Sequence, residues 1–288
     1  MSGSSTASPV VHHVACRSHG ETATLAVADW PGAADLPPLV CIPGFTRTRR
    51  DFDDLARSLD GRRRLLCLDL VGRGASTRLA DPAGYTMANY VAQVKQVLGS
   101  LALAEVSVLG VSMGGLLAMA LASDPSVGVR DLVVVDVGPT VPRIAFDLLD
   151  LYLATERSFP DFDALLVHVR RYFAACNLPS ELAWRWFALR GARRLPDGRY
   201  QLDYDPAIRV AFRDDFRGMQ QAWERYDCID ARTLVLRGAQ SHVLPADVAE
   251  EMTRRGPHAS VITISGTGHW PALVRPEENA AIGRFLAS

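Results

Sequence analysis

The chain has 288 residues, of which 48% are hydrophobic and 22% charged, and its 31 basic side chains nearly balance its 32 acidic ones. This composition excludes disordered, collagen-like and coiled-coil proteins. A net charge of −1 gives no reason to expect nucleic acid or an anionic membrane as a partner.

The cysteines and the start of the chain indicate the compartment. The five cysteines are odd in number and form no Cys-x-x-Cys pair, which is typical of a reducing environment. Residues 1–9 lack the basic start and apolar stretch of a signal peptide, and we expect them to be a disordered tail. No apolar run approaches the ~20 residues that cross a bilayer. We therefore expect a cytoplasmic protein, and the single lysine, Lys95, among 31 basic residues favours a GC-rich, bacterial source.

Eight short runs predict strands. They are rich in valine, leucine and isoleucine, and most of them end at glycine or proline, as expected for parallel strands buried on both faces. The runs are Val10–Cys16, Thr22–Asp29, Leu39–Ile42, Arg64–Asp69, Glu105–Val111, Asp131–Val137, Thr233–Arg237 and Ala259–Ile264.

Helical segments separate most of these strands. Apolar residues recur at i, i+3, i+4 and i+7 in several of them, and Met113–Ser123 is apolar almost throughout, as in a helix buried against a sheet. The predicted helices are Asp51–Asp60, Thr86–Leu103, Met113–Ser123, Ala246–Arg255 and Glu277–Leu286. Strands that alternate with helices predict an α/β fold, with a mainly parallel central sheet flanked by helices.

One segment interrupts the alternation. Residues 138–228 contain no convincing strand, several helical stretches and most of the aromatic residues. We interpret them as a helical cap, or lid, inserted after the sixth strand, with 10–137 and 229–288 forming the core. Most of the aromatic side chains would form the core of this cap, and the others would line an apolar pocket.

A candidate nucleophile lies at a strand-to-helix turn. Gly110-Val-Ser-Met-Gly114 matches G-x-S-x-G, follows an apolar strand and opens an apolar helix. A serine at such a turn projects its hydroxyl above the strand ends. The first helical amide, that of Met113, would lie beside a developing oxyanion. A purely structural turn is the alternative reading.

A serine hydroxyl needs a base to become a good nucleophile. His269 follows the last predicted strand in Gly266-Thr-Gly-His-Trp-Pro271, which places it at the same sheet edge as Ser112. Trp270, next to it, is a candidate substrate contact. The chain has no His-Glu-x-x-His and no Cys/His cluster, so we expect no metal and no organic cofactor.

Together these motifs resemble the α/β-hydrolase fold superfamily, in its cap-bearing serine hydrolase branch. The resemblance covers nearly everything after the tail, including Pro43-Gly-Phe45, Asp69–Ser76, the turn at Ser112 and Gly268-His-Trp270. It implies that the backbone amides of Phe45 and Met113 form the oxyanion hole. Pro43 replaces a histidine common in relatives, but the donor belongs to Phe45, so the hole is expected to persist. Asp69 and Arg73 are expected to hold loops.

The triad acid departs from the family pattern. Relatives place an aspartate in a run resembling R-G-x-x-S-D, whereas this chain has Arg237-Gly-Ala-Gln-Ser-His242. A histidine cannot supply the negative charge that stabilises an imidazolium. Asp136, at the end of the sixth predicted strand, is the preferred acid, with a loop-anchoring role as its alternative. Asp247 is a third option, and His242 would contact His269 or the substrate.

These residues predict hydrolysis of a carboxylic ester, or a related acyl bond, of a small hydrophobic substrate through an acyl-enzyme. Cleavage of the C–C bond of a vinylogous diketone is the first alternative. A small-molecule sensor with slow turnover is the second, because the usual aspartate is missing. No nucleic acid or membrane is expected as a partner, and the chain would act as a monomer or homodimer.

Overall fold

The structure is a computed structural model that describes residues 8–215 and 222–287. Most of the predicted tail, and residues 216–221 of the predicted cap, lie outside the described residues.

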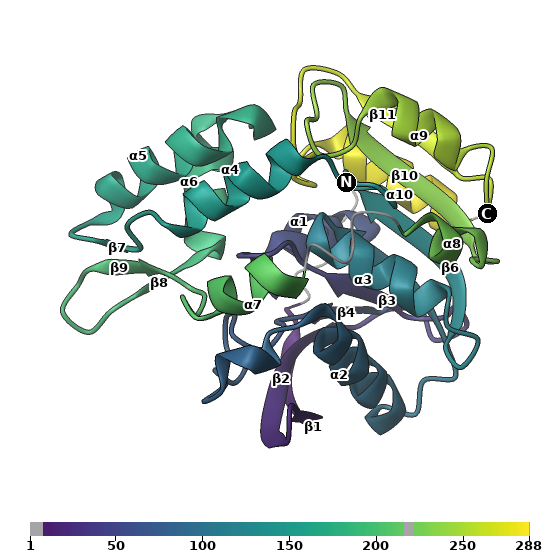
Figure 1. The fold of residues 1–288 in the computed structure, drawn as a ribbon, viewed down its shortest axis with the longest axis horizontal. Helices are drawn as coiled ribbons and strands as arrows, with labels where there is room; N and C mark the ends of the chain where they lie inside the picture. Colours follow the sequence, from purple (N-terminus) through teal and green to yellow (C-terminus); the bar gives the residue numbers. More distant parts are fainter. Residues whose placement is uncertain (1–7, 216–221, 288) are drawn as a thin grey trace, which may run out of the picture.

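Within the described residues, an eight-stranded sheet forms the centre of the molecule (Figure 1). Its strand order is β1-β2-β4-β3-β5-β6-β10-β11. β1 pairs antiparallel with β2, and β2 antiparallel with β4, while the other neighbours are parallel. The strands are β1 (Val10–Ser18), β2 (Glu21–Trp30), β3 (Leu39–Ile42), β4 (Leu65–Leu68), β5 (Glu105–Val111), β6 (Gly128–Val135), β10 (Arg232–Gly238) and β11 (Ser260–Ile264). The predicted α/β fold and mainly parallel sheet are confirmed.

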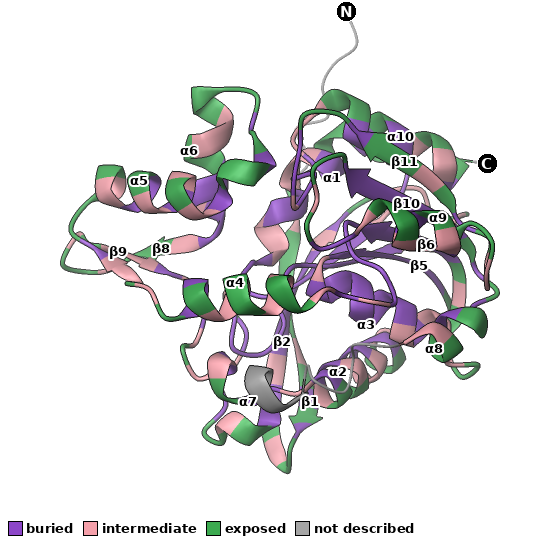
Figure 2. Ribbon diagram, turned by 45° about the horizontal axis from the view of Figure 1, so that its top comes forward, coloured by how far each residue is buried: buried purple, intermediate pink, exposed green. Residues whose placement is uncertain are grey.

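Helices cover both faces of this sheet. α1 and α10 pack together on one face, and α2, α3 and α8 lie on the other (Figure 1). α3 is almost wholly buried against β5 and β6 (Figure 2), as its continuous apolar sequence predicts. The core helices and 3₁₀ turns are η1 (Arg49–Phe52), α1 (Asp53–Leu59), η2 (Pro82–Gly84), α2 (Met87–Ser100), α3 (Met113–Ala122), α9 (Ala246–Met252) and α10 (Pro276–Ala287). No helix in the described ranges is long and apolar enough to cross a membrane.

The insertion follows β6, and its helices α4, α5 and α6 lie at one end of the molecule (Figure 1). Its helical elements are α4 (Arg143–Leu153), α5 (Phe162–Phe173), η3 (Ala174–Cys176), α6 (Glu181–Arg190), α7 (Ile208–Asp215) and α8 (Trp223–Asp227). The last of these packs against α3 of the core.

The expectation of an insertion without strands is wrong. β7 (Ser158–Phe159), β9 (Tyr200–Leu202) and β8 (Ala192–Arg194) form a small antiparallel sheet in that order. β8 and β9 are joined by a hairpin through Pro196-Asp-Gly198, in which Gly198 has φ +90°. Pro-Asp-Gly is a turn signal that the sequence carried, but strands this short have no detectable alternation.

Candidate active site

Ser112 occupies a strained turn between β5 and α3. Its φ of +52° and ψ of −119° are unusual for a residue with a side chain,. The two flanking glycines permit the turn. A Cβ on Gly110 would lie 2.0 Å from the Gly114 carbonyl oxygen, and one on Gly114 would lie 2.1 Å from that of Ile42. Both glycines of the G-x-S-x-G motif are therefore required by close backbone packing at the carboxyl edge of the sheet.

The structure brings together Ser112, His269 and Asp136. The Nε2 atom of His269 lies 3.0 Å from the Ser112 hydroxyl oxygen, and its Nδ1 atom lies 2.7 Å from Oδ2 of Asp136. The Asp136 side chain is fully buried, and that of His269 is 13% exposed. This is the geometry in which a histidine can take a proton from a serine while a carboxylate holds the imidazole ring.

The carboxylate of Asp136 is held from two sides. Asp136 has φ +55° directly after β6, and its Oδ1 atom accepts a hydrogen bond of 2.8 Å from the amide of Gly238. The Ser241 hydroxyl donates to Oδ2 at 2.7 Å and accepts from the amides of Val243 and Leu244. The loop after β10 thus orients an acid carried by the neighbouring strand β6.

Ser241 and Gly238 were not identified from the sequence as site residues. The run Arg237-Gly-Ala-Gln-Ser-His242 drew attention only because its last residue is not an aspartate. In that run, Ser241 matches the serine of the family pattern R-G-x-x-S-D, and this match was the available signal.

In the structure, neither His242 nor Asp247 places a carboxylate beside the His269 ring. The His242 ring centroid lies 5.9 Å from that of His269, and partial burial, followed by the nearby His269, lowers the pKa of His242 below its usual range. Asp247 is exposed in the first turn of α9. The reason for expecting a sensor was the lack of a carboxylate for His269, and Asp136 provides one.

The segment that carries Phe45 runs beside the nucleophile. A Cβ on Gly44 would lie 3.9 Å from the Ser112 Cβ, so the next peptide, with the Phe45 amide, is close to the reacting atoms. The fully buried Arg73 donates from Nε to the Phe45 carbonyl at 2.8 Å. Met113 is the first residue of α3, where helix amides have no acceptor within their own helix.

Asp69 contacts loops next to the segment that carries Phe45. Its carboxylate accepts hydrogen bonds from the amides of Arg49 (2.7 Å) and Ala75 (3.0 Å) and pairs with the Arg49 guanidinium. Asp69 and Arg73 thus both contact loops around the site rather than the triad.

A mainly apolar cavity of about 160 Å³ lies above Ser112. Core residues form its floor, and α4, α5 and the start of η3 form its walls, so the insertion completes the pocket. Trp270 is buried in it and contacts the rings of Phe173 and Phe187 in the insertion. The lining includes Phe45, Thr46, Arg47, Met113, Leu116, Val137, Val141, Ala145, Phe146, Leu148, Leu149, Tyr152, Tyr172, Ala175, His242 and Val243.

Within the part of the chain that the structure describes, no group of three or more His, Cys, Asp or Glu side chains could hold a metal ion.

Comparison with known proteins places the chain in a family. The model of the α/β-hydrolase fold matches residues 37–276. The chain is 35% identical to a 3-hydroxybutyrate-oligomer hydrolase of Cupriavidus necator, over 97% of this chain and 98% of that protein. It is 28% identical to a 2-hydroxy-6-oxo-2,4-heptadienoate hydrolase of Pseudomonas putida, over 79% of this chain and 78% of that protein.

A solved structure has the same fold over almost the whole length. It is an α/β hydrolase from Novosphingobium aromaticivorans, 31% identical, with a TM-score of 0.88 and coverage of 96% of this chain and 98% of that one. The mainly parallel sheet with helices on its two faces agrees with this match. The chain is a hydrolase that belongs to the α/β-hydrolase family.

Proposed function

We propose that this protein hydrolyses carboxylic esters through an acyl-enzyme on Ser112, with His269 as the base and Asp136 as the acid of the triad. The observation that carries the proposal is the continuous chain of hydrogen bonds from Asp136 through His269 to Ser112 at the floor of an apolar cavity. The insertion at 138–228 acts as a lid over this cavity.

The chemistry follows from the positions of the atoms. As Ser112 Oγ attacks the ester carbonyl, its proton moves to Nε2 of His269. The amides of Phe45 and Met113 donate to the tetrahedral oxyanion. Collapse of this intermediate passes the proton from Nε2 to the leaving alcohol. A water molecule, deprotonated by the same nitrogen, then attacks the acyl group, releases the acid and restores the serine.

We propose short esters of hydroxy acids as the substrate class. The cavity is small and mainly apolar, which suits short aliphatic chains with few polar groups. The hydrolase from Cupriavidus necator, to which this chain is similar over nearly its full length, acts on 3-hydroxybutyrate oligomers by its name.

C–C bond hydrolysis is the second candidate, because a relative is a 2-hydroxy-6-oxo-2,4-heptadienoate hydrolase. Such a substrate is a carboxylate and requires a cation in the pocket. The guanidinium among the lining residues, Arg47, is already bonded to Asp51 on two of its nitrogens. A linear 3-hydroxybutyrate oligomer also ends in a carboxylate, so the state of Arg47 does not distinguish the two substrates. We prefer the ester because the relative named for 3-hydroxybutyrate oligomers matches more of the chain at higher identity.

Labelling by a fluorophosphonate tests the proposal, together with turnover of p-nitrophenyl butyrate and of the linear 3-hydroxybutyrate dimer. We expect a single adduct on Ser112 and measurable turnover, both absent in Ser112→Ala with the fold unchanged by circular dichroism. Retained esterase activity in Ser112→Ala would exclude the proposed nucleophile. Labelling combined with turnover of a dienoate alone would favour the C–C reaction.

A further inference from the structure

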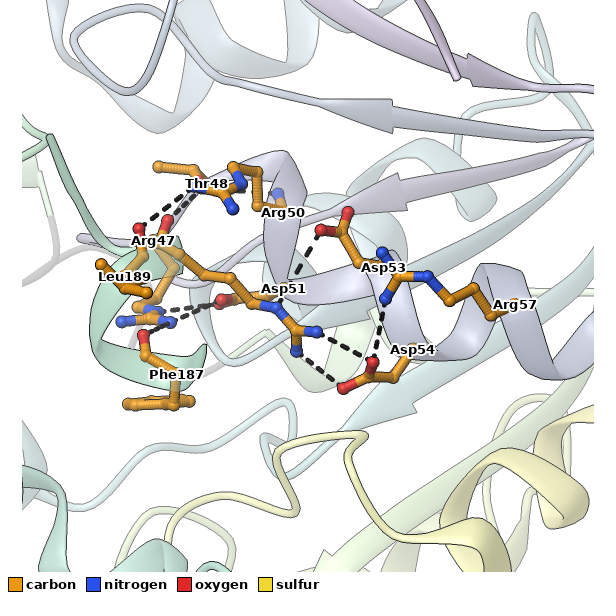
Figure 3. Close-up of polar contacts among 10 residues, drawn as sticks. Arg47, Thr48, Arg50, Asp51, Asp53, Asp54, Arg57, Phe187 and Leu189 are labelled. Atoms are coloured by element: carbon orange, nitrogen blue, oxygen red, sulfur yellow. Dashed lines mark hydrogen bonds and ion pairs between the residues drawn. The ribbon is translucent and has the colours of Figure 1, made fainter. Parts of the chain in front are cut away.

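The C-terminal end of α6 is capped by side chains of the core. The last four carbonyls of a helix accept no hydrogen bond from an amide of that helix, so they need donors from elsewhere. Three of them here receive hydrogen bonds from residues 47–50, directly after the Phe45 segment (Figure 3). Arg47 donates to Phe187 O at 2.9 Å, Thr48 to Arg190 O at 2.7 Å, and Arg50 to Leu189 O at 3.2 Å.

Buried ion pairs strengthen the same junction. Arg190, at the end of α6, forms two hydrogen bonds of 2.8 Å with the carboxylate of Asp54 in α1. Arg47 pairs with Asp51 in the same bidentate manner. Both guanidinium groups are almost fully buried, so removing one partner would leave an uncompensated charge away from water. The junction therefore resists separation of the insertion from the core.

The segment that precedes α6 is attached to the loop that carries His269. The amide of Gly268 donates to the Ala175 carbonyl at 2.7 Å, and the Asn177 side chain donates to the Gly266 carbonyl at 2.7 Å. The Cys176 thiol lies 3.5 Å from the carbonyl oxygen of His269 itself. Residues 174–190 thus contact the two loops that carry the base and the oxyanion donor.

We propose that residues 174–190 form a brace between the oxyanion loop (residues 43–48) and the histidine loop (residues 266–270). Thr48 and Arg190 are positioning residues in this brace. The reason is proximity along the chain: the amide of Arg47 donates to Gly44 O at 3.1 Å, so the Phe45 peptide lies inside the turn that Thr48 anchors. The inference rests on the proposed function, because it assigns the brace to the geometry of that reaction.

The brace also implies that one part of the insertion stays fixed while another part opens the pocket. A segment that holds two catalytic loops in place cannot swing away during each turnover without dismantling the site. Opening of the pocket is therefore left to other parts of the insertion, of which α4 is the helix that lines the cavity most extensively.

Replacement of Thr48 provides the sharpest test. Thr48 is buried and does not line the cavity. Thr48→Val keeps the shape of the side chain and removes both the donor to Arg190 O and the acceptor of the Arg50 amide at 3.4 Å, whereas Thr48→Ser keeps both. We expect Thr48→Val to lower kcat for p-nitrophenyl butyrate about 10-fold with KM unchanged, because complete loss of an oxyanion donor costs about 10²–10³-fold in kcat and a displaced donor loses part of that. Thr48→Ser should retain most of the wild-type kcat.

Two further measurements separate positioning from stability. The affinity for phenylboronic acid, which forms a tetrahedral adduct with a serine, should fall in Thr48→Val by the same factor as kcat/KM. Arg63→Gln is the matched control: Arg63 is equally buried and bonds backbone carbonyls far from the site, at Pro37 and Leu286. We expect it to lower the Tm with kcat unchanged. If Thr48→Val behaves like this control, or changes KM alone, the brace has no role in positioning and the inference is overturned.

Amide hydrogen exchange distinguishes failure of the brace from failure of the proposed function. Peptides covering residues 39–52 should exchange faster in Thr48→Val and in Arg190→Gln than in wild type, whether or not the protein turns over esters. Unchanged exchange in this segment would overturn the brace. Absence of esterase activity and fluorophosphonate labelling in the wild type would overturn the proposed function, and with it the catalytic role of the brace.

Discussion

At the residue scale, the acid of the proposed triad follows β6, whereas the family pattern has its aspartate in the loop after the neighbouring strand, β10. β6 and β10 are parallel neighbours with Val135 opposite Leu236, so an aspartate just after β6 and a residue in the loop after β10 approach the same histidine. The hydroxyl of Ser241 and the amide of Gly238 then bind the carboxylate from the side of β10. His242 stands at the position where the family pattern has its aspartate, and it lines the pocket.

Replacement of Asp136 tests this assignment. Asp136→Asn should lower kcat for p-nitrophenyl butyrate by about 10²–10⁴-fold, because an amide cannot stabilise the imidazolium and favours the wrong tautomer of the ring. Steady-state kinetics with KM near its wild-type value would be the expected readout. Asp247→Asn, which changes an exposed aspartate in the first turn of α9, is the control and should keep the wild-type rate. Equal rates for wild type and Asp136→Asn would exclude Asp136 as the acid.

The pH dependence of activity depends on the residue at position 242. Desolvation and the neighbouring His269 lower the pKa of His242, which favours its neutral form. A carboxylate at this position would stabilise the protonated form of His269 and raise its pKa. His242→Asp should therefore move the acidic limb of the kcat/KM profile to higher pH, by up to about one unit, as measured by kcat/KM across the pH range.

His242→Asn serves as the neutral comparison for that profile and should leave the limb where the wild type has it. If His242→Asp leaves the limb unmoved as well, the side chain at position 242 does not interact electrostatically with His269.

At the element scale, α4 separates the pocket from water. Ala145, Phe146, Leu149 and Tyr152 line the cavity from this helix, while its outer face is exposed (Figure 2). Leu148 belongs to both environments, since it lines the cavity and is 43% exposed. A side chain with this double exposure marks the rim through which the cavity meets solvent.

A larger side chain at this rim should select against long acyl chains. Leu148→Trp is expected to raise KM for p-nitrophenyl octanoate about 10-fold, with little change for the acetate, because it narrows the entrance without contacting the reacting carbonyl. The measurement is a KM series from acetate to octanoate. Leu151→Trp, on the same helix but 62% exposed and outside the cavity lining, should give the wild-type series. A uniform loss of kcat across the series in Leu148→Trp would contradict a role confined to entry.

The sequence predicted elements well where their signals were local. Apolar runs located the eight strands of the main sheet. The central strands are buried on both faces, which leaves a pattern that each strand carries alone, whereas the edge strands β1 and β11 are largely exposed. The strands β7, β8 and β9 were not predicted, because two or three residues are too few to show the alternation of apolar and polar side chains that marks a strand. The brace escaped for a different reason: the contacts of Thr48 with Arg190, and of Asn177 with Gly266, join residues far apart in the chain.

The same contrast between local and long-range signals applies to the site residues. Ser112 and His269 were identified because each lies at a strand end in a short recognisable run. The sequence favours Asp136 as the acid and leaves Asp247 open, because which of these loops lies beside His269 depends on the fold.

At the scale of the whole molecule, four of the five cysteines are buried and none is paired. Burial raises the pKa of the Cys16 and Cys67 thiols, and raises that of Cys176 to about 12. Because the thiolate is the reactive form, these groups are protected both by packing and by protonation. Cys228 is the exposed one.

Alkylation therefore reports the integrity of the whole fold. Native protein treated with iodoacetamide should gain one carbamidomethyl group, on Cys228, and protein unfolded in urea should gain five. Because all four buried thiols are packed away from solvent, and burial also raises the pKa of Cys16, Cys67 and Cys176, the native count should remain at one when the pH is raised from 7 to 9. Intact-mass spectrometry gives the count, and Cys228→Ser should reduce it to zero. Native labelling at Cys41 or Cys67 would mean that the central strands open at equilibrium.

The spacing of the proposed triad along the chain affects when hydrolysis can begin during protein synthesis. Ser112 and His269 are 157 positions apart, and Asp136 and His269 are 133 apart, with the whole insertion translated between the acid and the base. A nascent chain, or a fragment cut within the insertion, contains the nucleophile and the acid but no base to activate the serine. With the proposed triad, we therefore expect hydrolytic activity to arise only after His269, which follows β11, has been translated and has reached the sheet edge.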